Sequence, residues 1–157
     1  MSAVTFEPLA PWHLDIIAET ALGVDARQRW LEPDNRRMVA AWINPETFHA
    51  GFYQGQLIGV AGVIEHWPGR GEAVLVQAEG MPHVAWGPVT RHAHQLLARA
   101  HATGMIRIET TVRAEFLAGH RWARRLGFEL RCYDKRYFSD GSDAVQYVRL
   151  APARETR

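Results

Sequence analysis

The chain has 157 residues, of which 47% are hydrophobic and 22% charged, a balance typical of one soluble globular domain covering residues 1–157. Its single cysteine, Cys132, excludes an intrachain disulfide and a cysteine-based metal cluster. Neither a leader peptide nor an apolar run of about 20 residues is visible, so we expect a cytoplasmic protein that does not enter membranes.

The first part of the sequence predicts a strand followed by two helices. The strand covers Val4 to Leu9, and Pro11 then starts the first helix, because proline is favoured in a first helical turn. The second helix begins near Asp34. We expect it to end at Asn44-Pro45, since the residue before a proline avoids the helical region.

A hairpin and a further strand come next. Thr47 to Tyr53 and Leu57 to His66 are separated by the turn residues Gln54-Gly55, which is a hairpin signal. The run LIGVAGVI inside the second of these strands is almost entirely apolar, which is typical of a strand covered on both faces. After a turn rich in proline and glycine, Ala73 to Ala78 predicts another strand.

The second half predicts a long helix, a strand, a short helix and a terminal hairpin. The long helix runs from Gly87 to Gly104, with Pro88 in its first turn and glycine just past its end. Its apolar stripe comprises Val89, Ala93, Leu96, Leu97 and Ala100. The later elements are a strand at Met105 to Val112, a short helix closing on Leu126-Gly127-Phe128, and hairpin strands at Phe128 to Tyr137 and Ala144 to Leu150.

This order of elements, with Leu126-Gly127-Phe128 closing the short helix, resembles the GNAT acetyltransferase superfamily over Val4 to Leu150. The resemblance implies a mixed α/β (α+β) fold, in which a GNAT-like seven-stranded mixed sheet with splayed central strands is flanked by about four helices. Two stretches, AEFLAGHRWARRLGFE and YFSDGSDAVQYVRL, also resemble small GNAT proteins of phages and prophages more loosely.

The resemblance implies acetyl-CoA as the cofactor. In this family a loop of the form Gln/Arg-x-x-Gly-x-Gly/Ala opens the long helix and binds the pyrophosphate, because backbone N–H groups and a helix N-terminus attract an anion. Counting back from Gly104 places the first loop glycine at Gly87. Pantetheine would then meet the backbone of Gln77 and Ala78. The other implied cofactor-binding residues are Val84, Ala85, Trp86, Gly87, Val89, Thr90 and Arg91.

The sequence departs from the family pattern in both motifs. Val84 stands where glutamine or arginine is usual, Val89 stands where glycine or alanine is usual, and Pro88 removes one N–H donor. Arg91, one turn into the helix, is expected to replace some of the missing positive charge. Counting back from Phe128 places Ala123 where the family commonly has its catalytic tyrosine. The usual acid for the leaving thiolate is therefore absent from that position.

Three residues are candidates for the chemistry. Glu72 starts the strand where some family members carry a general-base glutamate, although a surface carboxylate after a turn is an equally simple interpretation. His83 flanks the cofactor loop and has a suitable intrinsic pKa for a base, but a solvated loop histidine would look the same. Tyr137 is a candidate substitute for the missing acid, against the alternative that it serves packing.

We therefore expect an acetyl-CoA-dependent N-acetyltransferase in which a small-molecule or protein amine attacks the thioester directly in a ternary complex. Cys132 lies on a strand away from the expected thioester, so no acyl-enzyme is invoked. The alternative is a catalytically weak or inactive GNAT-fold protein that serves a phage or prophage as a structural or interaction module. A homodimer is a further expectation for either.

Charge and histidine spacing bear on other classes of partner. Residues 1–86 carry 10 acidic and 5 basic residues, net −5, whereas residues 87–157 carry 13 basic and 7 acidic residues, net +6. This split fits either an anion site or a solvated arginine-rich face. No nucleic-acid motif accompanies it, so we expect no nucleic-acid partner. The histidines show no metal-binding spacing, and we expect no metal.

Overall fold

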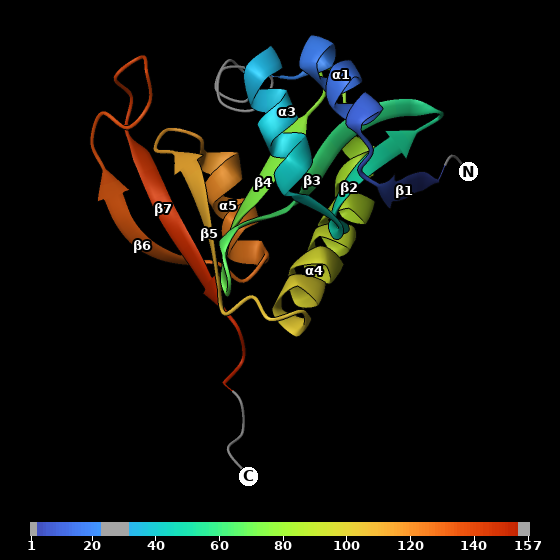
Figure 1. The fold of residues 1–157 in the computed structure, drawn as a ribbon. Helices are drawn as coiled ribbons and strands as arrows, with labels where there is room; N and C mark the ends of the chain where they lie inside the picture. Colours follow the sequence, from blue (N-terminus) through green and yellow to red (C-terminus); the bar gives the residue numbers. More distant parts are fainter. Residues whose placement is uncertain (1–2, 23–31, 154–157) are drawn as a thin grey trace. The chain divides into compact units, whose positions relative to one another are not determined.

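The computed structural model describes residues 3–22 and 32–153, which contain seven strands, four α-helices and one short 3-10 helix (Figure 1). In chain order these are β1 (Val4–Pro8), α1 (Pro11–Thr20), α3 (Pro33–Trp42), β2 (Ile43–Tyr53), β3 (Gln56–Trp67), β4 (Arg70–Gln77), η2 (His83–Ala85), α4 (Trp86–Ala102), β5 (Arg107–Arg113), α5 (Leu117–Arg125), β6 (Glu129–Asp134) and β7 (Ala144–Leu150).

The strands form one mixed sheet in the order β1-β2-β3-β4-β5-β7-β6. The β1/β2, β2/β3, β5/β7 and β6/β7 pairs are antiparallel. β4 and β5 pair in parallel, with Arg70 opposite Arg107 and Glu72 opposite Glu109. The mixed sheet and the strand-helix-strand connection expected from the sequence are therefore confirmed.

The described residues divide into two compact units. Unit 1 comprises residues within Met1–Ile64 and Ala73–Ala100, and unit 2 comprises residues within Glu65–Glu72 and His101–Arg157. Each unit has its own buried apolar residues and is described by itself below. The single domain over residues 1–157 stays a prediction.

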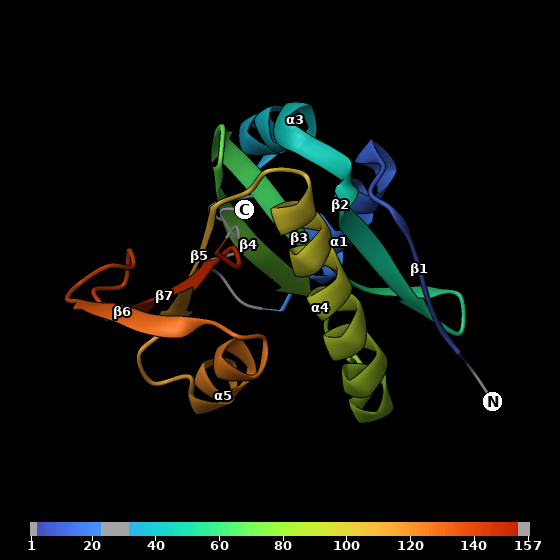
Figure 2. The same cartoon turned by 90° about the horizontal axis from the view of Figure 1, so that it is seen from below.

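Unit 1 has three layers. Helices α1 and α3 cover one face of its strands, and α4 covers the opposite face (Figures 1 and 2). Alternate strand residues point to the two faces, as the pleat of a sheet requires, except near Ile58, where the register between β2 and β3 shifts between Gly51 and Phe52. The core on the α1/α3 face includes Leu14, Ile17, Val39, Phe48, Ala50 and Val60. On the α4 face, Ile58, Leu75, Val89, Ala93 and Leu96 line a common pocket.

The long helix follows its sequence pattern closely. All five residues of the expected apolar stripe of α4 are buried. Gly104 adopts a φ of 117° two residues beyond the helix, and its N–H donates to the carbonyl of His101 at 3.1 Å. Glycine ends the helix there because a left-handed φ carries little steric cost for it. The predicted helix and its C-terminal stop are confirmed.

Unit 2 packs α5 against the strands β5 and β7. Ile108, Ala123, Leu126, Phe128 and Tyr147 are buried in it. The hydroxyl of Tyr147 and Nδ1 of His120 lie 2.7 Å apart, and Nε2 of His120 lies 2.9 Å from the carbonyl oxygen of Ala114. Because only a ring N–H can donate to the carbonyl, Nε2 carries the proton and Nδ1 accepts from the tyrosine.

Several strand boundaries differ from the sequence expectation. β2 begins at Ile43, four residues before the predicted Thr47, so Asn44-Pro45 lies inside this strand and the preceding helix already ends at Trp42. β5 begins at Arg107, two residues after the predicted Met105. β4 begins at Arg70, three residues earlier than predicted, because Arg70 to Glu72 find a parallel partner in β5. β6 ends at Asp134 and not at Tyr137. There the backbone turns, with a φ of 52° at Arg136, whose N–H donates to the carboxylate of Asp143 at 2.8 Å. β6 also has an irregular register against β7 between Leu130 and Cys132.

Candidate functional site

The start of α4 is built by a short 3-10 turn that leads directly into the helix. The N–H of Ala85 donates to the carbonyl of Pro82 at 3.0 Å, and the N–H of Trp86 donates to the carbonyl of His83. The Thr90 hydroxyl donates to the carbonyl of Trp86 at 2.7 Å, which ties the second turn to the first. Seven of the predicted cofactor residues, 84–87 and 89–91, thus lie in one ordered helix start.

Gly87 has the N–H group best placed for a ligand in this turn. The first three residues of an α-helix have no intrahelical acceptor for their N–H groups. Here the first of them, Trp86, is already bonded to His83, and the third, Pro88, has no N–H. Gly87 lies between these two residues, at the positive end of a helix of 17 residues, where an anion is attracted.

Arg91 lies directly beside this glycine. A Cβ placed on Gly87 would have Nη1 of Arg91, at 3.7 Å, as its nearest non-neighbouring atom in the described structure. Gly87 and Arg91 are both exposed. The guanidinium of Arg91 thus lies beside the exposed first turn of α4, and a guanidinium next to a helix N-terminus suits a phosphate or another anion.

The other predicted cofactor residues are placed differently. The side chains of Ala85, Val89 and Thr90 are buried, with exposures of 0%, 8% and 7%, so only their backbone is available to a ligand. Val84 is 63% exposed. The N–H of Ala78 donates to the carbonyl of Ile58 at 2.9 Å, and the carbonyl of Gln77 accepts from Leu22 at 2.7 Å. These two backbone groups are therefore already engaged within unit 1.

Glu72, in unit 2, is not a solvated surface carboxylate. Its side chain is only 12% exposed, and Oε2 lies 3.1 Å from Nε2 of His66. Glu72 is opposite Glu109 in the parallel register, which places both carboxylates on one face of the strand pair.

The other two candidates for the chemistry are exposed. Tyr137, also in unit 2, is 42% exposed with its ring edge-on to Phe138. His83 is exposed in η2 of unit 1.

A cluster of three arginines around one carboxylate also lies in unit 2. Arg70, Arg107 and Arg131 all pair with Glu109. Burial would raise the pKa of Glu109, but hydrogen bonds from Arg107 and Arg70 outweigh it and hold the pKa below its ordinary value. Arg131, one of the 13 basic residues in the second half of the chain, is thus partly neutralised. Sequence reasoning missed this cluster, whose only local signal is the charged alternation Arg107-Ile108-Glu109.

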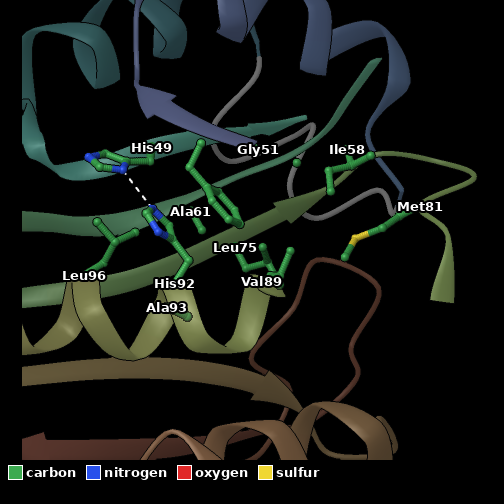
Figure 3. A pocket seen from close by; sticks show the side chains of 12 residues that line it. His49, Gly51, Ile58, Ala61, Leu75, Met81, Val89, His92, Ala93 and Leu96 are labelled. Carbon is green, nitrogen blue, oxygen red and sulfur yellow. Dashed lines mark hydrogen bonds between the residues drawn. The ribbon is translucent and has the colours of Figure 1, made fainter. Parts of the chain in front are cut away.

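A histidine pair in unit 1 was also missed. Nδ1 of His49 on β2 and Nε2 of His92 on α4 lie 2.8 Å apart, and both rings line a pocket under α4 (Figure 3). The ring of Phe6 stacks on His92 with 3.8 Å between centroids. Burial lowers the pKa of His92 to about 4, and the charges of His49 and Arg99 add to this effect. The signal was present, because His92 falls inside the apolar stripe of the helix.

Two further structural tests concern metals and membranes. Within residues 3–22 and 32–153, no group of three or more histidine, cysteine, aspartate or glutamate side chains is arranged to hold a metal ion. Among the helices that the structure describes, none combines the length and the apolar character needed to cross a membrane.

Comparison with known proteins identifies the fold. No family model and no curated protein sequence matches the chain. Solved structures do match. Ard1 from Thermoplasma volcanium has a TM-score of 0.74 at 17% identity, covering 96% of this chain and 99% of that one. The ribosomal-protein-S18-alanine N-acetyltransferase from Escherichia coli has a TM-score of 0.72 at 16% identity, covering 99% of both chains.

A third match includes the cofactor. RimL, the ribosomal L7/L12 alpha-N-protein acetyltransferase, was solved in complex with coenzyme A, and it has a TM-score of 0.71 at 17% identity over 96% of this chain and 95% of that one. Another match is an acetyltransferase of the GNAT family from Bacillus anthracis, with a TM-score of 0.69 at 13% identity over 96% of this chain and 97% of that one. At these identities the likeness concerns the fold: this chain has the fold of GNAT N-acetyltransferases.

Proposed function

We propose that the protein is an N-acetyltransferase that uses acetyl-CoA and acetylates a small-molecule or protein amine. One observation carries the proposal: the guanidinium of Arg91 lies beside Gly87 at the start of α4, and both residues are exposed. An anionic diphosphate is the natural ligand of such a surface. The shared fold with N-acetyltransferases, one of them bound to coenzyme A, supports this choice of anion.

The chemistry is a direct attack. The amine nitrogen forms a bond to the thioester carbon, the amine proton passes to a base, and the carbon–sulfur bond breaks to release the thiolate. Glu72 is our candidate base, with His83 as a second candidate. A thiol with a pKa near about 8.5 leaves with little acid assistance. This matters because Ala123 is buried where an acid would be expected, and Tyr137 is the proposed substitute.

Calorimetric titration with acetyl-CoA tests cofactor binding. We expect saturable binding by the wild type and a roughly tenfold weaker affinity in Arg91→Ala, because a charge-assisted hydrogen bond at an exposed site is worth about 1.5 kcal/mol. Arg124→Ala, which removes an exposed arginine from α5, is the matched control. Absence of binding at millimolar acetyl-CoA would refute the proposal, and equal affinities of the two variants would refute the role of Arg91.

Turnover is tested separately with Glu72→Gln. The amide still reaches His66 but cannot take a proton, so we expect acetyl-CoA affinity to be retained while thiol release with a panel of amines is lost. Glu129→Gln, on the exposed part of β6, controls for loss of a negative charge. Unchanged turnover in Glu72→Gln would remove Glu72 as the base.

A non-catalytic GNAT-fold protein is the second candidate. The observation that favours it is Ala123, which is only 3% exposed and has no acidic proton to offer. Under this candidate, acetyl-CoA would bind without turnover of any amine in the panel, or would not bind. The likeness to phage and prophage proteins stays a prediction.

A further inference from the structure

The His49–His92 pair is a direct polar link between β2 and α4, in addition to the bond from Arg99 to the backbone of Glu46. The two ring nitrogens are 2.8 Å apart, within hydrogen-bonding distance, so one of them carries the shared proton and the other accepts it. Figure 3 shows the two rings facing each other across the pocket, with Ala93 and Leu96 beside His92 on the helix. Phe6 of β1 stacks almost parallel to His92, at an interplanar angle of 5°.

Among residues 3–22 and 32–153, no acidic side chain raises the pKa of either ring. From α4, Arg99 repels positive charge on the pair, and Arg99 itself donates to the backbone carbonyl of Glu46 at 3.1 Å. Glu46 on β2 is exposed to solvent. Oε1 of Glu7 on β1 lies 2.7 Å from Nε2 of His13. β3 and β4 contribute only apolar side chains and glycine to the pocket, including Ile58, Ala61 and Leu75. Hydrogen bonds with the Pro45 backbone and the Gln95 side chain favour the protonated rings, but burial and the charge of Arg99 outweigh them and keep the pKa of both histidines lowered.

The number of protons on the pair decides whether the link exists. A neutral pair has two protons on four ring nitrogens, and one of them can lie between the rings. A singly protonated pair has three, and the link still holds. A doubly protonated pair has four, so both facing nitrogens carry hydrogen and neither can accept. Protonation of the second ring thus replaces the hydrogen bond by a repulsive contact between two N–H groups, each on a positively charged ring.

We propose that His49 and His92 form an acid-sensitive latch, which holds α4 against β2 while the pair shares a proton and releases the helix when both rings are protonated. Release would weaken the packing of residues 89–100, whose apolar side chains are buried against this face of unit 1. If the proposed function holds, the start of α4 then loses its fixed orientation, and acetyl-CoA affinity falls with pH. That last consequence, unlike the latch, rests on the proposed function.

The sign and size of the effect follow from proton linkage. The pKa of His92 is about 4 with the latch closed, against 6.5 for a free histidine, so the open form binds more protons. The closed-to-open ratio is therefore independent of pH above pH 6.5. It decreases as the pH falls from 6.5 to about 4 and stays constant below that. From pH 7.5 to 5, His92 alone should lower the closed-to-open ratio by roughly thirtyfold or less, since solvent screens a partly exposed ring, and the lowered pKa of His49 acts in the same direction.

Hydrogen exchange read by mass spectrometry tests the latch. The wild-type protein is compared at pH 7.5 and 5, with exchange corrected for its intrinsic pH dependence. Peptides from α5 in unit 2 serve as the internal reference. We expect α4 peptides to lose protection at pH 5 while α5 peptides keep theirs. His92→Gln keeps a hydrogen-bonding group but cannot be protonated, so its α4 peptides should change much less. His94→Gln, an exposed residue of the same helix, should behave as the wild type.

The outcomes separate the latch from the proposed function. Equal loss of α4 protection in wild type and His92→Gln, or loss spread equally over α4 and α5, would overturn the latch. If His92→Gln does not fold, His49→Gln is measured against the same criteria. A separate titration follows acetyl-CoA affinity at the two pH values. Failure to bind at either pH would reject the proposed function alone, because the exchange experiment needs no cofactor.

Discussion

Replacement of Gly87 by alanine should change stability and cofactor binding in opposite directions. The added Cβ is accommodated without a clash, because the nearest non-neighbouring atom in the described structure, Nη1 of Arg91, is at an ordinary contact distance of 3.7 Å. Gly87 has no left-handed φ and lies in the first turn of α4. Glycine in a helix costs about 0.5–1 kcal/mol relative to alanine, and the lower value applies near a helix end. We expect the variant to be stabilised by about 0.5 kcal/mol.

Binding should weaken because the same Cβ occupies the surface from which an anion would approach the Gly87 N–H. A charge-assisted hydrogen bond contributes about 1.5–3 kcal/mol, so its loss corresponds to a roughly 10- to 100-fold weaker affinity for acetyl-CoA. Thermal unfolding and calorimetric titration on the same preparations give the two quantities. For a chain of this size the stabilisation should raise Tm by about 1–2 °C.

Ala98→Gly is the matched control, because Ala98 is exposed in the middle of the same helix. It should lower stability by about 1 kcal/mol and leave acetyl-CoA affinity unchanged. An affinity of Gly87→Ala equal to that of the wild type would refute the close approach of a ligand to this glycine. A strong loss of stability in Gly87→Ala would refute the expectation that the Cβ is accommodated without a clash.

Two further substitutions test the packing of each unit. Gly62→Ala in β3 would place Cβ 2.3 Å from the carbonyl oxygen of Thr47 and 2.4 Å from Cα of Phe48, so we expect a loss of about 2–3 kcal/mol in urea unfolding; wild-type stability would contradict this close strand approach. Tyr147→Phe leaves Nδ1 of His120 without its donor in a buried site, which should cost about 1–2 kcal/mol at pH 7; an unchanged midpoint of thermal unfolding would show that the bond contributes nothing.

Features with a local physical cause were predicted from the sequence. The helix from Gly87 to Gly104 was recognised because a proline in the first turn and a glycine past the end are local signals, and the helix Trp86–Ala102 agrees with them. The apolar run within Leu57 to His66 was recognised as covered on both faces, and Ile58, Val60, Val63 and Ile64 are indeed buried.

Features that depend on residues distant in the sequence were not predicted. His49 and His92 are 43 positions apart, and nothing local to either indicates that β2 and α4 bring them together. Glu109 looked like one charge in an alternating strand, but Arg70 and Arg131 reach it from two other strands. The early start of β4 has the same origin, since its first three residues are ordered by pairing with β5. The roles of Glu72, His83 and Tyr137 stay predictions.

The irregular register of β6 has a consequence for association between copies of the chain. β6 lies at one end of the strand order, so its outer backbone groups are the natural place for a further strand to add. The irregularity between Leu130 and Cys132 disturbs the even spacing that an added strand would need. The charged side chains of Glu129, Arg131 and Asp134 also disfavour the addition of a strand at this edge. Dimerisation by edge-to-edge continuation of the sheet at β6 is therefore disfavoured, which leaves the β1 edge or side-chain contacts elsewhere for a homodimer.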